Sequence, residues 1–257
     1  MIPKLITYDI DGTLVPEYAR TVPQVNLDAI ARAKAAGCVI CPSSGRTHSN
    51  LVRLLGKYVE DTYMITMNGG AIYGPGDTPE RFRYIEPDMA EDIFRHQVEV
   101  GENCPIIFCE NSMYLYNGDE EMARRLSELH RGPVTIISAI REVEEPMIKI
   151  SSFCRDANAL FERLAEGFMD KVNVAVAGKE WVDYTVSDKG TGISDMCEIL
   201  GISLAETAAI GDNYNDVPML EKAAYPIIMS GASAELRKRY PMQSDSFTEA
   251  IDRLMSL

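Results

Sequence analysis

Two carboxylates stand two residues apart near the start of the chain, at the end of a short apolar segment. Asp9 and Asp11 are followed by Gly12 and Thr13. On a chain that is leaving a strand, this spacing lets both carboxylates face one cavity. Gly12 permits a tight turn, and the backbone N–H groups after it can bind an anion. The pattern suits catalysis by a carboxylate, although surface aspartates in an ordinary turn would have the same spacing.

A second group of oxygen donors follows another apolar segment. Next to a predicted helix start, it supplies four hard oxygen ligands: Asp212, Asn213, Asn215 and Asp216. This is the kind of donor set that Mg²⁺ prefers. Taken alone, the segment is also typical of an Asn/Asp-rich turn before a helix.

Three further polar positions lie where a predicted strand ends or a helix begins. Segment 43–46 enters a helix, and its hydroxyls and free N–H groups suit a phosphate oxygen or, more simply, cap the helix. Lys189 precedes a helix, where a lysine is usually solvated, and Asn68 precedes two glycines that favour a plain turn. Phosphoryl transfer through a carboxylate needs a nucleophile, a hydroxyl donor, a cation and a metal ligand, and the chain supplies them in the order Asp9, Ser44, Lys189 and Asp212.

Alternating strands and helices must position these residues. Apolar strands are predicted at 4–10, 38–42, 63–67, 207–210 and 225–229, and helices at 25–36, 47–56, 191–200, 218–223 and 248–254. This alternation predicts a parallel sheet covered on both faces. Such sheets bind ligands at the carboxyl ends of their strands, where the polar residues lie.

Between the two stretches that show this alternation lies a region with a different order of strands and helices. A turn cluster at 74–79 marks a boundary. Beyond it, helical segments at 89–100, 120–129 and 157–167 alternate with strands at 106–109, 113–116, 134–137, 147–153 and 172–177. Strands that follow each other closely at 105–116 and 172–186 indicate antiparallel hairpins. We therefore expect a separate α+β module inserted into the first domain.

Composition excludes several classes of protein. The 257 residues contain 25 Lys+Arg and 39 Asp+Glu, a net charge of -14, so we expect neither a nucleic-acid nor an anionic membrane partner. The hydrophobic content of 46% is that of a globular chain, and no apolar run reaches the length of a membrane span. The first ten residues do not resemble a signal peptide. The six cysteines are scattered, and Cys38 and Cys41 belong to a predicted buried strand, so a reduced, cytoplasmic enzyme or binding protein is expected.

The ordered motifs resemble those of the haloacid dehalogenase-like (HAD) phosphatase superfamily, in particular the Cof-like subgroup with a type IIB cap. Ser44-Gly45-Arg46 is similar to the family's Thr-Gly-Arg, and Asn68 to the start of its Asn-Gly-Ala. The resemblance implies a Rossmann-like, three-layer α/β/α core at residues 1–78 and 187–257. It also implies an inserted α+β cap at 79–186 that determines substrate specificity. Gly231-Ala232, where many members have Asn-Ala, departs from the pattern.

The same resemblance implies a role for each site residue. Asp9 would be the nucleophile and Asp11 the general acid/base. Mg²⁺ would be bound by Asp9, Asp212 and the backbone carbonyl of Asp11. The phosphate-binding residues would be Gly12, Ser44, Gly45 and Lys189, and the supporting residues would be Asn215, Asp216, Arg46 and Asn68.

The implied activity is hydrolysis of a small phosphorylated metabolite, sugar phosphates first, by a monomer or homodimer. Two alternatives stay open. A sugar phosphomutase would return the phosphoryl group to a bound bisphosphate, and a catalytically weak protein would only bind a phosphometabolite.

Overall fold

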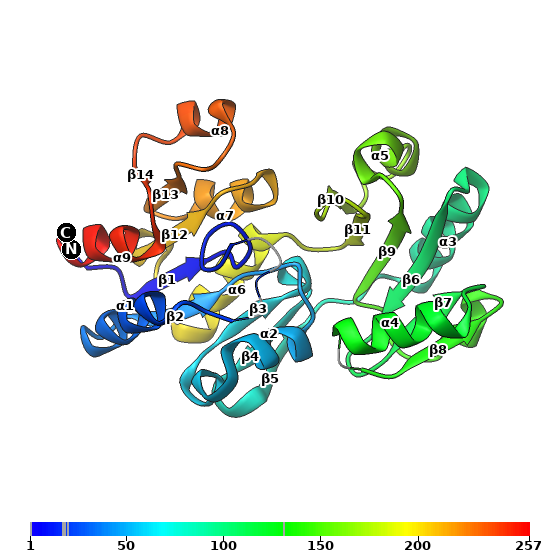
Figure 1. Cartoon of the computed structure of the whole chain (residues 1–257), viewed down its shortest axis with the longest axis horizontal. Helices are drawn as coiled ribbons and strands as arrows, with labels where there is room; N and C mark the ends of the chain where they lie inside the picture. Colours follow the sequence, from blue (N-terminus) through cyan, green and yellow to red (C-terminus); the bar gives the residue numbers. More distant parts are fainter. Residues whose placement is uncertain (1, 17–18, 20, 131) are drawn as a thin grey trace. The chain divides into compact units, whose positions relative to one another are not determined.

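The computed structural model describes residues 2–16, 19, 21–130 and 132–257, whose contacts divide the chain into two compact units (Figure 1). The core unit contains residues 1–81 and 188–257, and the inserted unit contains residues 82–187. The boundaries expected from the sequence, after residues 78 and 186, lie three residues and one residue earlier in the chain.

A five-stranded parallel sheet forms the centre of the core unit. Its strand order is β14-β13-β12-β1-β2. The strands are β1 (Leu5–Tyr8), β2 (Val39–Pro42), β12 (Thr207–Gly211), β13 (Tyr225–Met229) and β14 (Gln243–Ser244). Leu5 of β1 lies opposite Val39 of β2 and Thr207 of β12. β1 and β12 are buried along their whole length, which is why they appear in the sequence as continuous apolar runs.

Helices cover both faces of this sheet. They are α1 (Gln24–Ala35), α2 (His48–Leu55), α6 (Lys189–Leu200), α7 (Val217–Lys222), α8 (Ala234–Arg239) and α9 (Phe247–Met255). Successive side chains of a strand point to opposite faces. Thr7 of β1 therefore contacts Met219 of α7, whereas Tyr8 packs edge-on against Phe247 of α9 with ring centroids 5.0 Å apart. The predicted three-layer α/β/α core is confirmed.

The third predicted core strand lies in a different sheet. A small sheet has the order β3-β4-β5, built from β3 (Met64–Thr66), β4 (Ala71–Gly74) and β5 (Thr78–Phe82). β3 pairs antiparallel with β4 because the chain reverses at Met67, Asn68 and Gly69, all of which have positive φ. A bridge between Ser43 and Ile65 links β3 to the end of β2. The turn cluster at 74–79, expected to mark a boundary, connects β4 to β5.

The inserted unit is built on a six-stranded sheet of order β10-β11-β9-β6-β7-β8. Its strands are β6 (Asn103–Phe108), β7 (Met113–Tyr116), β8 (Val134–Ile137), β9 (Lys149–Cys154), β10 (Asn173–Val176) and β11 (Trp181–Thr185). The pairs are antiparallel except β7–β8. An apolar cluster joins the sheet to α3 (Pro87–Val100) and α5 (Ala157–Ala165), and α4 (Glu120–His130) packs near β8. This is the α+β organisation predicted for the insertion.

Two further expectations from the sequence concern membrane spans and the state of the cysteines. Among the described residues, no helix is long and apolar enough to cross a membrane. All six cysteines are free thiols, and burial raises the pKa of both Cys38 and Cys41. A buried thiol with a raised pKa is a packing group rather than a nucleophile or a metal ligand.

Candidate active site

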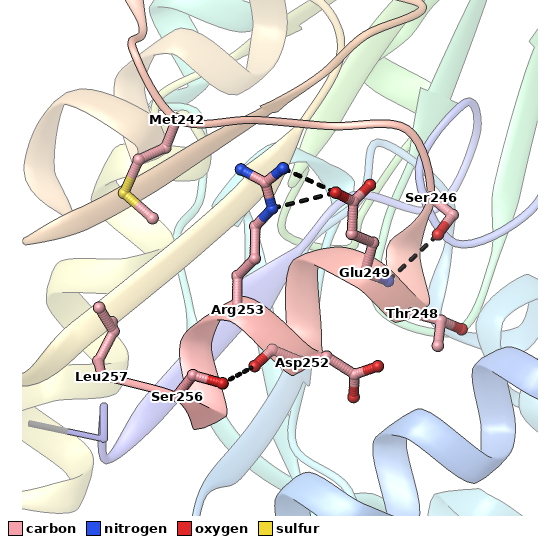
Figure 2. A pocket seen from close by; sticks show the side chains of 8 residues that line it. All are labelled: Met242, Ser246, Thr248, Glu249, Asp252, Arg253, Ser256 and Leu257. Carbon is pink, nitrogen blue, oxygen red and sulfur yellow. Dashed lines mark hydrogen bonds and ion pairs between the residues drawn. The ribbon is translucent and has the colours of Figure 1, made fainter.

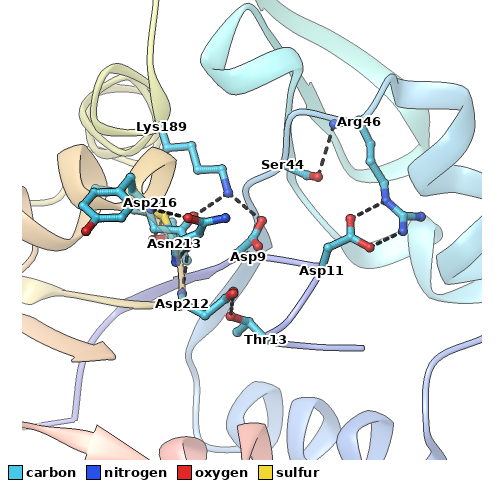
Figure 3. Close-up of polar contacts among 12 residues, drawn as sticks. Asp9, Asp11, Thr13, Ser44, Arg46, Lys189, Asp212, Asn213 and Asp216 are labelled. Atoms are coloured by element: carbon cyan, nitrogen blue, oxygen red, sulfur yellow. Dashed lines mark hydrogen bonds and ion pairs between the residues drawn. The ribbon is translucent and has the colours of Figure 1, made fainter. Parts of the chain in front are cut away.

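The two aspartates of the first motif have different partners (Figure 3). Asp9 follows β1 and is buried, and its Oδ1 accepts a hydrogen bond from Lys189 Nζ at 2.5 Å. Asp11 is more exposed and directs its carboxylate to Arg46, whose Nη2 lies 2.6 Å from Oδ1. The motif therefore presents two carboxylates in two electrostatic environments, which is what separate catalytic roles require.

Lys189 connects the nucleophile candidate to the second acidic motif. It is the first residue of α6, which Asp188 caps by accepting from the Thr191 N–H. The fully buried ammonium contacts Asp216 Oδ1 at 2.5 Å as well as Asp9. The other oxygen of Asp216 accepts from the backbone N–H groups of Asp212 and Asn213. Both oxygens of Asp216 are thus occupied, and this residue fixes both the motif and the lysine.

Asp212 comes close to the first motif because a glycine stands opposite it. Gly12 has a φ of +86°, and a Cβ there would lie 2.3 Å from Asp212 Oδ2. Thr13 Oγ1 donates a hydrogen bond of 2.8 Å to Asp212 Oδ1. Only glycine combines this backbone conformation with such a close approach, so Gly12 is needed for the two motifs to meet.

The acidic residues fit a divalent cation. One carboxylate oxygen each of Asp9, Asp212 and Asp216 lies within 4.8 Å of the others. With all three carboxylates ionised beside one lysine, this largely buried place would carry a net charge of two negatives, which is costly without a cation. Burial raises the pKa of Asp9 to about 8; Lys189 opposes this shift, and Asp216 and Asp212 add to it. A bound cation would stabilise the ionised form instead.

Oxygen donors of this type suit Mg²⁺. Asp9 and Asp212 would be its side-chain ligands, because the oxygens of Asp216 already have partners. The Asp11 carboxylate is engaged by Arg46, so the metal contact expected of Asp11 would use its backbone carbonyl.

The expected phosphate-binding loop lies at the end of β2. Ser44 is buried, and its Oγ accepts from the Arg46 N–H at 3.2 Å while its own hydroxyl hydrogen can be donated. The reversed turn after β3 supports this loop, because the Asn68 N–H donates to the Ser44 carbonyl at 2.9 Å. A Cβ on Gly45 would lie 3.1 Å from Asn68 Oδ1, so Asn68 packs directly on the loop. Asn215 is half-buried in the same short turn as Asp216.

Three polar residues of the site had no role in the sequence prediction. They are Thr13, Asn50 and Asp188. Asp188 could have been found, because an aspartate just before a helix is a typical N-cap. Thr13 and Asn50 act through side-chain contacts that no spacing in the sequence indicates.

A surface cavity lies elsewhere on the core unit, along α9 (Figure 2). Glu249 and Arg253, which line it, pair with each other at 2.7 Å. None of its lining residues belongs to the predicted site, so it has no part in the arrangement around Asp9.

Comparisons with known proteins identify the family of the chain. The family profile of haloacid dehalogenase-like hydrolases matches residues 6–250, so the chain belongs to that family and is an enzyme of the hydrolase class. A protein of Streptococcus pyogenes serotype M6, named as an inferred phosphatase, is 25% identical in an alignment of length 252 that covers 91% of this chain and 90% of that protein.

Solved structures share the whole fold. The HAD subclass IIB sugar phosphatase BT4131 superposes with a TM-score of 0.82 at 21% identity, covering 99% of this chain and 100% of that one. A haloacid dehalogenase-like hydrolase from B. subtilis superposes with a TM-score of 0.81 at 22% identity, covering 99% of each chain. The haloacid dehalogenase-like family predicted from the motifs is confirmed, and the solved structures share the fold of both units.

Proposed function

We propose that this hydrolase is a Mg²⁺-dependent phosphatase of small phosphorylated metabolites, with sugar phosphates as the first class to test. The observation that carries the proposal is the convergence of Asp9, Lys189 and Asp212 at the carboxyl ends of the parallel strands, with an excess of negative charge. The function named for the streptococcal relative and for the subclass IIB structure supports the reaction and the sugar class.

The residues suit a reaction in two steps. A carboxylate oxygen of Asp9 attacks the phosphorus, the bond to the leaving oxygen breaks, and Asp11 gives that oxygen a proton. Water then attacks the phosphorus of the aspartyl-phosphate, Asp11 takes a proton from the water, and the bond to Asp9 breaks. Lys189 and Ser44 hold the phosphoryl oxygens. When bound, Mg²⁺ would supply positive charge to those oxygens and keep Asp9 ionised.

The rest of the proposal concerns the surroundings of the site. The inserted unit would contact the leaving group and select the substrate. The six free thiols support a reducing compartment such as the cytoplasm, and the net charge of -14 supports the absence of a nucleic-acid partner.

Phosphate release tests the proposal. The protein is assayed with Mg²⁺ over sugar phosphates, nucleotides and small organic phosphates, beside Asp9→Asn and the control Asp170→Asn, whose aspartate is exposed. We expect Asp9→Asn to lower turnover at least about 10³-fold, as removal of a nucleophile does, and a chelator to abolish it. Full activity of Asp9→Asn, or full activity with the chelator, would refute the assignment. Activity that requires a bisphosphate would identify a phosphomutase instead.

A further inference from the structure

We propose that Arg46 is the positioning residue for Asp11, the carboxylate that transfers protons, and that Asn50 holds Arg46 in place. The inference rests on the proposed phosphatase function and deepens it. It gives a specific role to Arg46, expected so far only as a supporting residue, and to Asn50, which had none.

The contact between Arg46 and Asp11 is bidentate. Arg46 Nε donates to Asp11 Oδ2 at 2.8 Å, and Nη2 donates to Oδ1 at 2.6 Å. Two parallel hydrogen bonds fix the plane of a carboxylate as well as its distance, which a single contact or a lysine cannot do. The Asp11 side chain is 36% exposed, so packing alone would leave it several rotamers.

Arg46 is held at three other points. Its Nη1 donates to Oδ1 of Asn50 at 3.1 Å, and its backbone N–H donates to Ser44 Oγ. Its carbonyl accepts from the Met67 N–H at 3.0 Å. Asn50 is buried in α2, on the rigid framework of the core unit. Asn50 on α2 therefore positions the Arg46 guanidinium, and the guanidinium positions the Asp11 carboxylate.

The site divides its two cations between its two catalytic carboxylates (Figure 3). Lys189 contacts Asp9 and Asp216, and Arg46 contacts Asp11. Each carboxylate oxygen has two lone pairs, so the two hydrogen bonds from Arg46 leave each oxygen of Asp11 a further lone pair for proton transfer. This pairing keeps the proton-transferring group at a fixed place without drawing Lys189 away from the nucleophile.

Two substrates separate positioning of the acid from other roles. p-Nitrophenyl phosphate releases a stable phenolate that needs no proton, whereas a sugar phosphate releases an alkoxide that does. Because kcat/KM reports the first step, we expect Arg46→Ala to lower it about 30-fold for the sugar phosphate and less than about 3-fold for p-nitrophenyl phosphate. The larger loss is a part of the roughly 10²–10⁴-fold that general acid catalysis contributes, because Asp11 itself is still present. Arg46→Lys should recover part of the loss, and Asn50→Ala should show the same selectivity at about 3-fold.

Asp11→Asn is the reference, because it removes the acid itself. We expect the same selective pattern with a larger loss, and no further loss when Arg46→Ala is added to it, because residues that act as one unit are not additive. Thermal unfolding shows whether each variant is folded, and Arg46→Lys and Asn50→Ala carry the test if Arg46→Ala is not.

Equal losses on both substrates would overturn the inference and make Arg46 a phosphate-binding or structural residue. Unchanged kinetics in Arg46→Ala would overturn it as well. Failure of the proposed function is distinguishable, because it would appear as full activity of Asp9→Asn, whatever the Arg46 variants do.

Discussion

Each unit of the molecule buries a lysine against an aspartate, but the two units balance charge differently. In the core unit, Lys189 contacts two carboxylates and a third lies beside them. In the inserted unit, the 4% exposed Lys149 forms an ion pair with Asp183 at 3.1 Å.

The inserted pair is also satisfied by neutral groups. Ser151 Oγ donates to the second oxygen of Asp183 at 2.6 Å, and the Lys149 ammonium lies 4.4 Å from the centroid of the Phe108 ring. The two partners carry opposite single charges, so the pair itself has no net charge with which to hold an ion. The comparison teaches that the imbalance of charge around Lys189, rather than burial of a lysine, distinguishes the proposed cation site from the inserted pair.

The largest expected difference between the two pairs is in turnover, when each lysine is replaced by methionine. Lys189→Met removes the cation that faces the phosphoryl oxygens, so we expect turnover to fall about 10³-fold, as when a preorganised electrostatic group is lost. Lys149→Met should keep turnover within about 3-fold at a temperature where the variant is folded, because its partner lies within the inserted sheet. Steady-state phosphate release measures both. A large loss of turnover in Lys149→Met would erase the distinction between the two pairs.

The pair of Lys149 and Asp183 should contribute to the unfolding free energy of the inserted unit. Removing Lys149 leaves the 1% exposed Asp183 as an uncompensated buried charge, which costs about 3 kcal/mol of unfolding free energy. Replacing both partners, as in Lys149→Met with Asp183→Leu, should recover most of that loss. The exposed Lys179→Met is the control, with an expected change of less than about 0.5 kcal/mol.

The chain has a convenient reporter for this measurement. Trp181 is its one tryptophan and lies on β11, the strand that carries Asp183. Urea unfolding followed by tryptophan fluorescence therefore reads the inserted unit. If Lys149→Met were as stable as the parent protein, the pair would be a surface-like contact with little influence on folding.

The comparison also shows what sequence reasoning could and could not predict. Four strands of the parallel sheet were found because they are apolar runs, and the motifs were found because they stand where those runs end. The fifth, β14, was not predicted, because its two residues, Gln243 and Ser244, are polar. Lys149 and Asp183 could not be paired in advance. Asp183 lies opposite Ser151, and Lys149 lies opposite Thr185, so their diagonal contact depends on strand register.

Two features of the core unit were hidden for related reasons. The reversal that sends β3 into its own sheet uses positive φ at Met67 and Asn68, which non-glycine residues adopt only occasionally. The pairing of Arg46 with Asp11 depends on side-chain conformations of residues 35 positions apart. Local pattern indicates which residues end a strand, whereas their partners are decided by tertiary contacts.

The last prediction, with the smallest expected effect, concerns the change in Tm on Mg²⁺ binding, which should depend on the acidic residues of the core unit and not on the inserted pair. A ligand that binds only the folded state stabilises it by about 2.7 kcal/mol at one hundred times its Kd, which for a chain of this size raises Tm by roughly 5–10 °C. We expect Mg²⁺ to stabilise the parent protein and Asp183→Asn to a similar extent, because the inserted pair has no excess charge. Asp212→Asn should lose the shift, because it removes a proposed ligand and one of the uncompensated negative charges.

Scanning calorimetry with Mg²⁺, against NaCl of equal ionic strength, measures these shifts without any substrate. An equal shift in Asp212→Asn would show that Mg²⁺ stabilises the chain through its general surface charge, and the charge imbalance around Lys189 would then have to serve the phosphoryl chemistry by another route.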